Sequence, residues 1–167
     1  IAVRLLLAAL VALPICAQEA ATGVTPVWDV RSYMKSLVDD VKKMEQLINR
    51  ADPDYWVAKG APSAYVQQQK SAQVSMQHLI ASTEKLSTDP EHLVTAIDTL
   101  FQLEKMELFL GSLREGIRKY QNSSLADDIS HALTPNLLHG QRLRQHIQDL
   151  AVTPAQDDEF YKNNPAQ

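Results

Sequence analysis

Cysteine, glycine, aromatic residues and runs of basic residues are all scarce in this chain, and each scarcity excludes a class of protein. The 167 residues include 1 cysteine and 5 glycines, and aromatic residues make up 6%. A single cysteine excludes an intrachain disulfide, a Cys-x-x-Cys-His haem attachment and a thiolate zinc cluster. No run of basic residues is longer than Lys42-Lys43, so the clustered positive charge of a nucleic-acid-binding surface is absent.

Catalytic sequence motifs are also absent. The chain has no Gly-x-Ser-x-Gly elbow and no glycine-rich loop that could cradle a phosphate. Its length fits one domain with a hydrophobic core, and its richness in Ala, Leu, Gln, Lys and Glu favours helices. We therefore expect an all-helical protein that is not an enzyme.

The first residues predict export. Arg4 is followed by an apolar run from Leu5 to Leu13, which is too short to span a membrane and is typical of a signal peptide. Small residues follow, and cleavage after Ala17 would release a periplasmic or secreted chain without a membrane span. A lipid anchor on Cys16 is the alternative, but Ile15 fits the residue before a lipidated cysteine poorly. We expect a signal peptide over 1–17 and a flexible lead-in over 18–25.

Four stretches with apolar residues at spacings of three and four predict amphipathic helices. They cover about 26–50, 62–86, 90–121 and 124–152. Pro135 interrupts the fourth pattern, because proline lacks the backbone donor that a helix interior needs. In this stretch the side chains expected to face inward are Ile129, Leu133, Leu137, Leu143, Ile147 and Leu150.

The simplest arrangement of four such helices is an up-down-up-down antiparallel bundle. We predict this all-α fold over 26–152, with the fourth helix kinked or broken near Pro135 and a loose acidic tail over 153–167. The topology would gather Tyr55, Trp56, Tyr65 and Tyr120 at one end of the bundle.

The stretch from Pro90 to Gln121 has the widest apolar pattern. Val94, Ile97, Phe101 and Leu108 extend it beyond the single seam that a bundle needs. One interpretation is that this helix is the most buried of the four. The other is that these four residues form a surface for a protein partner or for self-association.

Glu104 falls within the same apolar arc, where a carboxylate needs a partner or a metal. Glu107 follows one turn later, and His139 is expected at a similar depth on the fourth helix. These three residues are a candidate metal site, although the Glu-x-x-His pairs of diiron bundles are missing. The alternative is that Glu104 reaches the edge of the bundle or pairs with a basic residue.

Met34 and His146 are the last candidate pair. Exported haem bundles of the cytochrome b562 type use a Met early in the first helix and a His late in the fourth, and residues 34–52 loosely resemble the first helix of that family. The resemblance implies a b-type haem held by Met34 and His146. The alternative is that His146 is exposed, because it lies at the flank of the apolar seam of its helix.

The main hypothesis from the sequence is therefore an exported, non-enzymatic helical bundle without a cofactor, which binds a partner or assembles with itself. The alternatives are the haem bundle and the carboxylate and histidine metal site.

Overall fold

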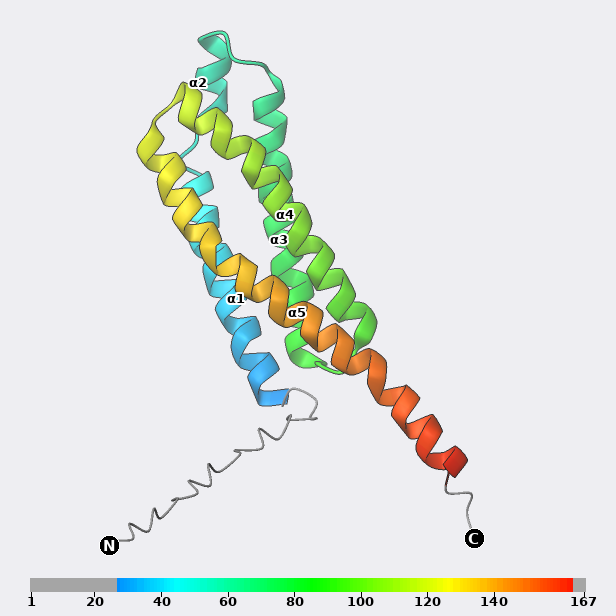
Figure 1. Ribbon diagram of the computed structural model, residues 1–167. Helices are drawn as coiled ribbons and strands as arrows, with labels where there is room; N and C mark the ends of the chain where they lie inside the picture. The colour runs from blue at the N-terminus through cyan, green and yellow to red at the C-terminus, as the bar shows by residue number, and fades with distance from the viewer. Residues whose placement is uncertain (1–26, 164–167) are drawn as a thin grey trace, which may run out of the picture.

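The computed structural model describes residues 27–163, and side chains from 29 to 152 (Figure 1). The helices are α1 (Val27–Ile48), α2 (Pro53–Ala58), α3 (Ala64–Thr88), α4 (Leu93–Tyr120) and α5 (Ser123–Asn163), and no strand occurs in this part of the chain. The predicted signal peptide over 1–17, the lead-in over 18–25 and the last four residues lie outside the described range.

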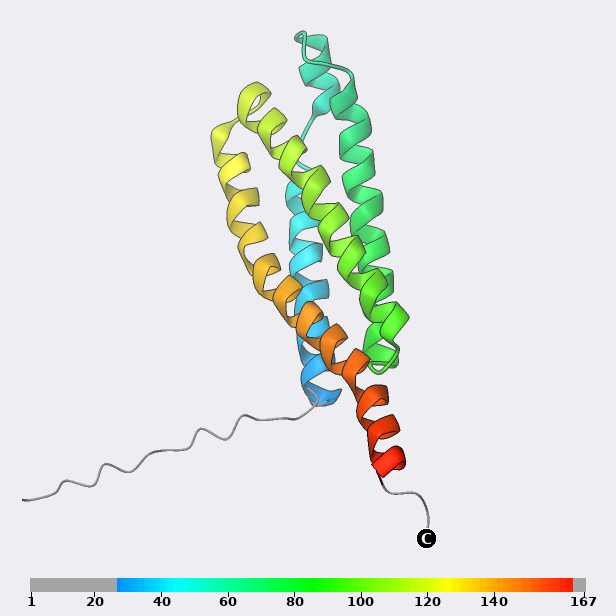
Figure 2. The same cartoon turned by 45° about the vertical axis from the view of Figure 1, so that its right-hand side comes forward.

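The four long helices pack against one another, which confirms the predicted all-α fold. α3 contacts α1 and α4, and α5 contacts α4 and α1, so the contacts form a closed ring around one core. The connections after α1 and α4 lie at one end of the molecule, and the α3–α4 connection lies at the other end (Figures 1 and 2).

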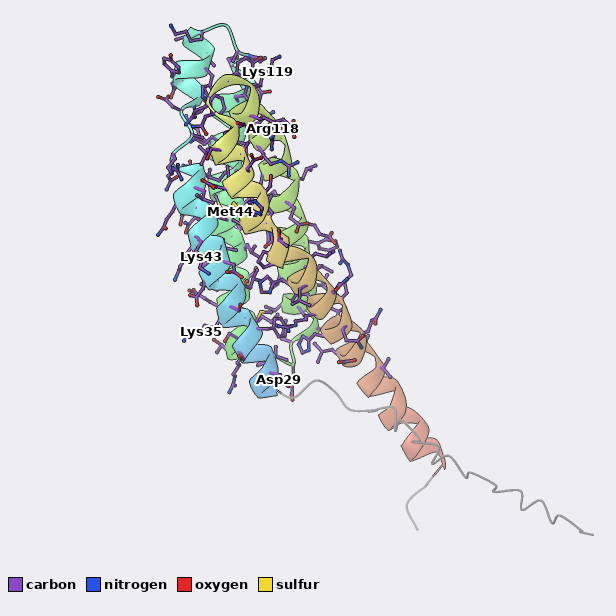
Figure 3. All side chains as sticks on the ribbon, turned by 60° about the vertical axis from the view of Figure 1, so that its left-hand side comes forward. Asp29, Lys35, Lys43, Met44, Arg118 and Lys119 are labelled. Atoms are coloured by element: carbon purple, nitrogen blue, oxygen red, sulfur yellow. The ribbon has the colours of Figure 1, made fainter. Side chains whose placement is uncertain are left out.

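α1 shows how the apolar spacing produces this core. Its inward residues recur every three or four positions, and none is more than 1% exposed: Val30, Met34, Leu37, Val41, Met44 and Ile48. Lys35 and Lys43 lie on the outward face, whereas Met44 points into the bundle (Figure 3). Burying each large apolar side chain stabilises the fold by about 1.5–3 kcal/mol.

α2 lies in the long connection after α1, where no helix was expected. The Asp52 side chain accepts a hydrogen bond from the Tyr55 backbone N–H at 3.0 Å, and Pro53 begins the helix. Trp56 is fully buried, and its ring lies 5.8 Å from Tyr65, which in turn lies 5.7 Å from Tyr120. Three of the four expected aromatic residues therefore meet at this end, while Tyr55 is 54% exposed.

α4 begins at Leu93 rather than at Pro90. The His92 ring caps it, because Nδ1 accepts a hydrogen bond from the Thr95 backbone N–H at 3.1 Å. Among its glycines, Gly116 permits a close helix approach: a Cβ there would lie 2.5 Å from the Tyr65 ring. Gly111 has open space at the same position.

α5 is helical across Pro135, so the predicted break does not occur, and it continues to Asn163 through most of the predicted tail. The prediction that Leu137 faces inward is wrong, because this side chain is 69% exposed. The unbroken helix keeps one phase in which Ile129, Asn136 and Leu143 recur at intervals of seven and are all buried. Leu137, next to Asn136, therefore faces outward.

Candidate functional site

α4 carries apolar residues on two opposite faces. Its inward face includes Leu103 and Leu110, which are at most 1% exposed. On the other face Val94, Phe101 and Leu108 are 69%, 61% and 73% exposed. These three residues, spaced seven apart, are called the outward stripe here; Ile97 lies beside it and is half-buried.

The rotation of the helix separates the two faces. Phe101 and Leu103 are two residues apart, which turns the side chain by about 200° around the helix axis. A step of seven residues changes the direction by only about 20°, so the outward stripe stays on one line. The interpretation that α4 is simply the most buried helix is therefore wrong at the outward stripe, where large apolar side chains face solvent.

Charged residues border the outward stripe on both sides. Toward α3, Lys105 lines a cavity of about 220 Å³ with Val74 and Phe109. Asp98 precedes Lys105 by seven residues and therefore lies on the same side of α4, where it accepts a hydrogen bond from the Gln102 side chain at 3.2 Å. Toward α5, Glu104 forms an ion pair with Arg144 at 2.7 Å. An apolar strip between charged borders is the usual composition of a protein interface.

Glu104 is thus at the edge of the bundle, paired with a basic residue. It shares a cavity of about 170 Å³ with Glu107, Asn136 and Leu137. Burial raises the pKa of Glu107, and the nearby Glu104 charge adds to this, while the Arg144 charge acts in the opposite direction.

The structure does not bring His139 to these two glutamates. Its Nε2 lies 3.2 Å from Asp40 Oδ2 on α1, and its side chain is 4% exposed. Across the described side chains, no group of three or more His, Cys, Asp or Glu residues is arranged to hold a metal. Glu104, Glu107 and His139 therefore belong to two separate contacts, one between α4 and α5 and one between α1 and α5.

The contact between Asp40 and His139 places a charged group against the core. The Asp40 carboxylate also accepts a hydrogen bond from Lys43 Nζ at 2.9 Å. Partial burial by itself raises the pKa of Asp40, but the hydrogen bonds from Lys43 and His139 outweigh it, so the pKa is lowered. This arrangement links α1 to α5 and stabilises the ionised carboxylate.

Met34 and His146, the candidate haem ligands, make separate contacts. Met34 lines a cavity between α1 and α3 with Arg31 and Thr83, and His146 is not among the residues around it. The expectation that His146 is exposed is wrong, because it is 2% exposed. The spacing along α5 explains the burial of His146: Leu125, His139 and His146 are separated by multiples of seven residues, so all three lie on the same buried face of the helix. His146 Nε2 lies 2.7 Å from the Pro90 carbonyl oxygen, where it joins α5 to the α3–α4 connection.

A cavity of about 560 Å³ between α1 and α5 was not expected from the sequence. Ser32, Tyr33, Ser36, Arg142 and Gln145 are among its lining residues. The Arg142 guanidinium lies 6.0 Å from the Tyr33 ring centroid. Burial raises the pKa of Tyr33 despite the Arg142 charge, and the Tyr33 hydroxyl has no hydrogen-bond partner among the described residues.

Sequence reasoning found the outward stripe but missed its borders. Asp98 and Lys105 were not singled out, although their spacing from Phe101 is visible in the sequence, and Leu137 was assigned to the core. None of the described helices is both long and apolar enough to cross a membrane.

No family model matches this chain, and no curated protein and no solved structure is found to match it.

Proposed function

We propose that this chain is an exported, non-enzymatic helical-bundle protein that acts by binding a partner or a second copy of itself through the outward stripe of α4. The single observation that carries the proposal is the exposure of Val94, Phe101 and Leu108, which are 61–73% accessible on the face opposite the core. The fold does not need these residues, because a second set of apolar residues already fills the inward face. Contiguous exposed apolar side chains bordered by polar groups are typical of interaction sites.

The bundle geometry supports a surface-based role. We infer an up-down-up-down antiparallel topology, because consecutive long helices pack as neighbours and their connections lie alternately at the two ends of the molecule. We also infer that α5 is bent near Pro135, because proline lacks the backbone donor of a helix interior. In this arrangement α4 is held between α3 and α5. Its backbone is therefore already ordered, so binding through the outward face loses little backbone conformational entropy.

Export is the second part of the proposal, and it rests on the N-terminal pattern of Arg4, the Leu5–Leu13 run and Ala17. Fractionation of cells that produce the chain, followed by N-terminal sequencing, tests it. We expect the processed protein in the periplasm or the medium, beginning at Gln18. A lipid-modified Cys16 found by intact mass would replace soluble export with membrane anchoring, and an unprocessed cytoplasmic chain would contradict both.

The binding role is tested by gentle crosslinking in the native host, followed by identification of the proteins that are attached to each of three forms of the chain. The first is the unchanged chain, and the second carries Val94→Ser, Phe101→Ser and Leu108→Ser. The matched control carries the same change at three exposed residues elsewhere, Tyr55, Leu138 and Val152. We expect binding partners, including further copies of the chain, to be lost only from the stripe variant.

The same set of binding partners on all three forms would contradict the proposal. Circular dichroism of each form confirms that the helices remain folded, so a loss of binding cannot be attributed to unfolding.

A further inference from the structure

We propose that the outward stripe binds a second copy of this chain, with the two α4 helices packed antiparallel around a two-fold axis beside Phe101. This inference rests on the proposed function and identifies the partner. It follows from the spacing of the stripe, the charges along its borders and the exposed Leu137 on α5.

The outward stripe is symmetric about its centre. Val94 precedes Phe101 by seven residues and Leu108 follows it by seven. In an antiparallel pair centred on Phe101, Val94 of each copy meets Leu108 of the other, and the two Phe101 rings meet at the axis. A two-fold interface requires a surface that is complementary to itself, and this spacing provides one over about 21 Å of helix.

The charges on the α3 side have the same property. Asp98 lies three residues before Phe101 and Lys105 lies four residues after it. The two-fold axis reverses the helix direction but keeps this side facing itself, so Asp98 of each copy comes beside Lys105 of the other. A parallel pair would instead place Asp98 beside Ile97, without a cation.

Both charged groups are available for such pairing. Lys105 makes no ion pair with any side chain in the described part of the protein, and Asp98 accepts one hydrogen bond, from Gln102. Glu104, on the opposite side of the stripe, is already held by Arg144 at 2.7 Å. Opposite charges that are free on one border therefore set the register of the pair.

The α5 side provides an apolar contact. The same axis brings Ile97 of the second copy to the level of Glu104 and Leu108. Leu137 lies at this level, because it shares a cavity with Glu104 and Glu107, and it is 69% exposed. The pairing thus gives a role to a leucine that the bundle itself leaves in solvent.

Sedimentation equilibrium on the full chain tests the charge register. We expect the unchanged chain to dimerise, and Asp98→Lys or Lys105→Asp alone to weaken the dimer about tenfold, because each creates two like-charge contacts. The double variant with both changes restores the opposite charges and should recover affinity to within about threefold. An equimolar mixture of the two single variants should form heterodimers in preference to either homodimer. A double variant that is as weak as the single ones would overturn the register.

Cysteine crosslinking tests the orientation in a Cys16→Ser background. Val94→Cys and Leu108→Cys chains should form a disulfide when mixed, and neither should do so alone, because the bond requires Cβ atoms about 4 Å apart. Crosslinking of Val94→Cys chains alone would show a parallel pair and overturn the proposal.

The failure of this inference can be separated from failure of the proposed function. A chain that stays monomeric at every concentration overturns self-pairing. If the serine variant of the stripe nevertheless loses a companion in the native host, the stripe binds a different protein and the proposed function stands. If all forms keep the same companions as well, both proposals fail.

Discussion

At the scale of single residues, Gln121 illustrates how one side chain holds an end of the bundle together. Its Oε1 accepts hydrogen bonds from the Asp52 backbone N–H at 3.0 Å and from Trp56 Nε1 at 3.1 Å, and its Nε2 donates to the Arg50 carbonyl oxygen at 2.8 Å. Trp56 is fully buried, so its indole N–H has no alternative partner in solvent.

We predict that Gln121→Ala lowers the free energy of unfolding by about 2–3 kcal/mol, because it leaves a buried donor unsatisfied and frees the end of α1. Urea unfolding followed by circular dichroism measures the change. Gln67→Ala is the matched control: Gln67 is exposed and bonds only to Ser71, one turn away, so it should cost less than about 0.5 kcal/mol. Equal effects of the two changes would contradict this role of Gln121.

Asp40 should make the free energy of unfolding depend on pH in the acidic range. Its pKa is lowered because hydrogen bonds from Lys43 and His139 outweigh the opposing effect of burial. A carboxyl group with a lowered folded pKa stabilises the protein above its unfolded pKa of 3.8, and this stability is lost as the pH falls through the folded pKa.

We therefore expect Asp40→Asn to lower the free energy of unfolding by about 1 kcal/mol at neutral pH and to flatten its decline below about pH 4. The measurement is a series of urea unfolding curves from pH 7 to pH 2. Asp39→Asn changes an exposed neighbour and should keep the decline of the unchanged chain. An equally steep decline for Asp40→Asn would exclude Asp40 as its source.

At the scale of the helices, two glycines in α4 predict opposite outcomes for the same substitution. A Cβ at Gly116 would lie 2.5 Å and 2.8 Å from Tyr65 ring atoms, and the Tyr65 ring is fixed between Trp56 and Tyr120. Gly116→Ala should therefore separate α3 from α4 and destabilise the protein by about 1–3 kcal/mol. At Gly111 a Cβ meets nothing within 4 Å, so Gly111→Ala should stabilise it by about 1 kcal/mol through helix propensity.

Thermal unfolding of the two variants checks this pair of predictions. Stabilisation by both changes would mean that Tyr65 moves aside at no cost, and that the close approach at Gly116 does not hold the helices in place.

The four long helices could be predicted from the sequence, because each has an inward row of apolar residues at spacings of three and four. The sequence did not show which row faces inward when two rows compete. In α4 both faces are apolar, so the sequence left open whether Phe101 is buried with Leu103 or exposed as part of a partner surface. In α5 the buried row contains Asn136, His139 and His146, and Leu137 was chosen over them because it is apolar. Only the packing of neighbouring helices decides between such rows.

At the scale of the whole molecule, the two faces of α4 have different roles. The inward face contributes to folding, and the outward stripe contributes nothing that the isolated bundle needs. Spacing alone singled out Ile97 and the three residues of the outward stripe, but the exposure of the stripe and the positions of Asp98 and Lys105 relative to α3 and α5 required the structure. Stability and association should accordingly respond to different residues.

This separation predicts how the melting temperature depends on concentration. If the outward stripe pairs two copies, dimerisation stabilises the folded state by mass action, so the melting temperature of the unchanged chain rises with its concentration. Phe101→Ser removes the contact at the axis, and we expect its melting temperature to be independent of concentration. At the lowest concentration the two chains should differ by less than about 0.5 kcal/mol, because a side chain that is 61% exposed adds little to the core. Leu103→Ser, on the inward face, is the control: it should lower the melting temperature at every concentration, because Leu103 is 1% exposed.

Calorimetry over a hundredfold range of protein concentration distinguishes these cases. A large loss of stability for Phe101→Ser in dilute solution would show that the outward stripe belongs to the fold instead of to an interface.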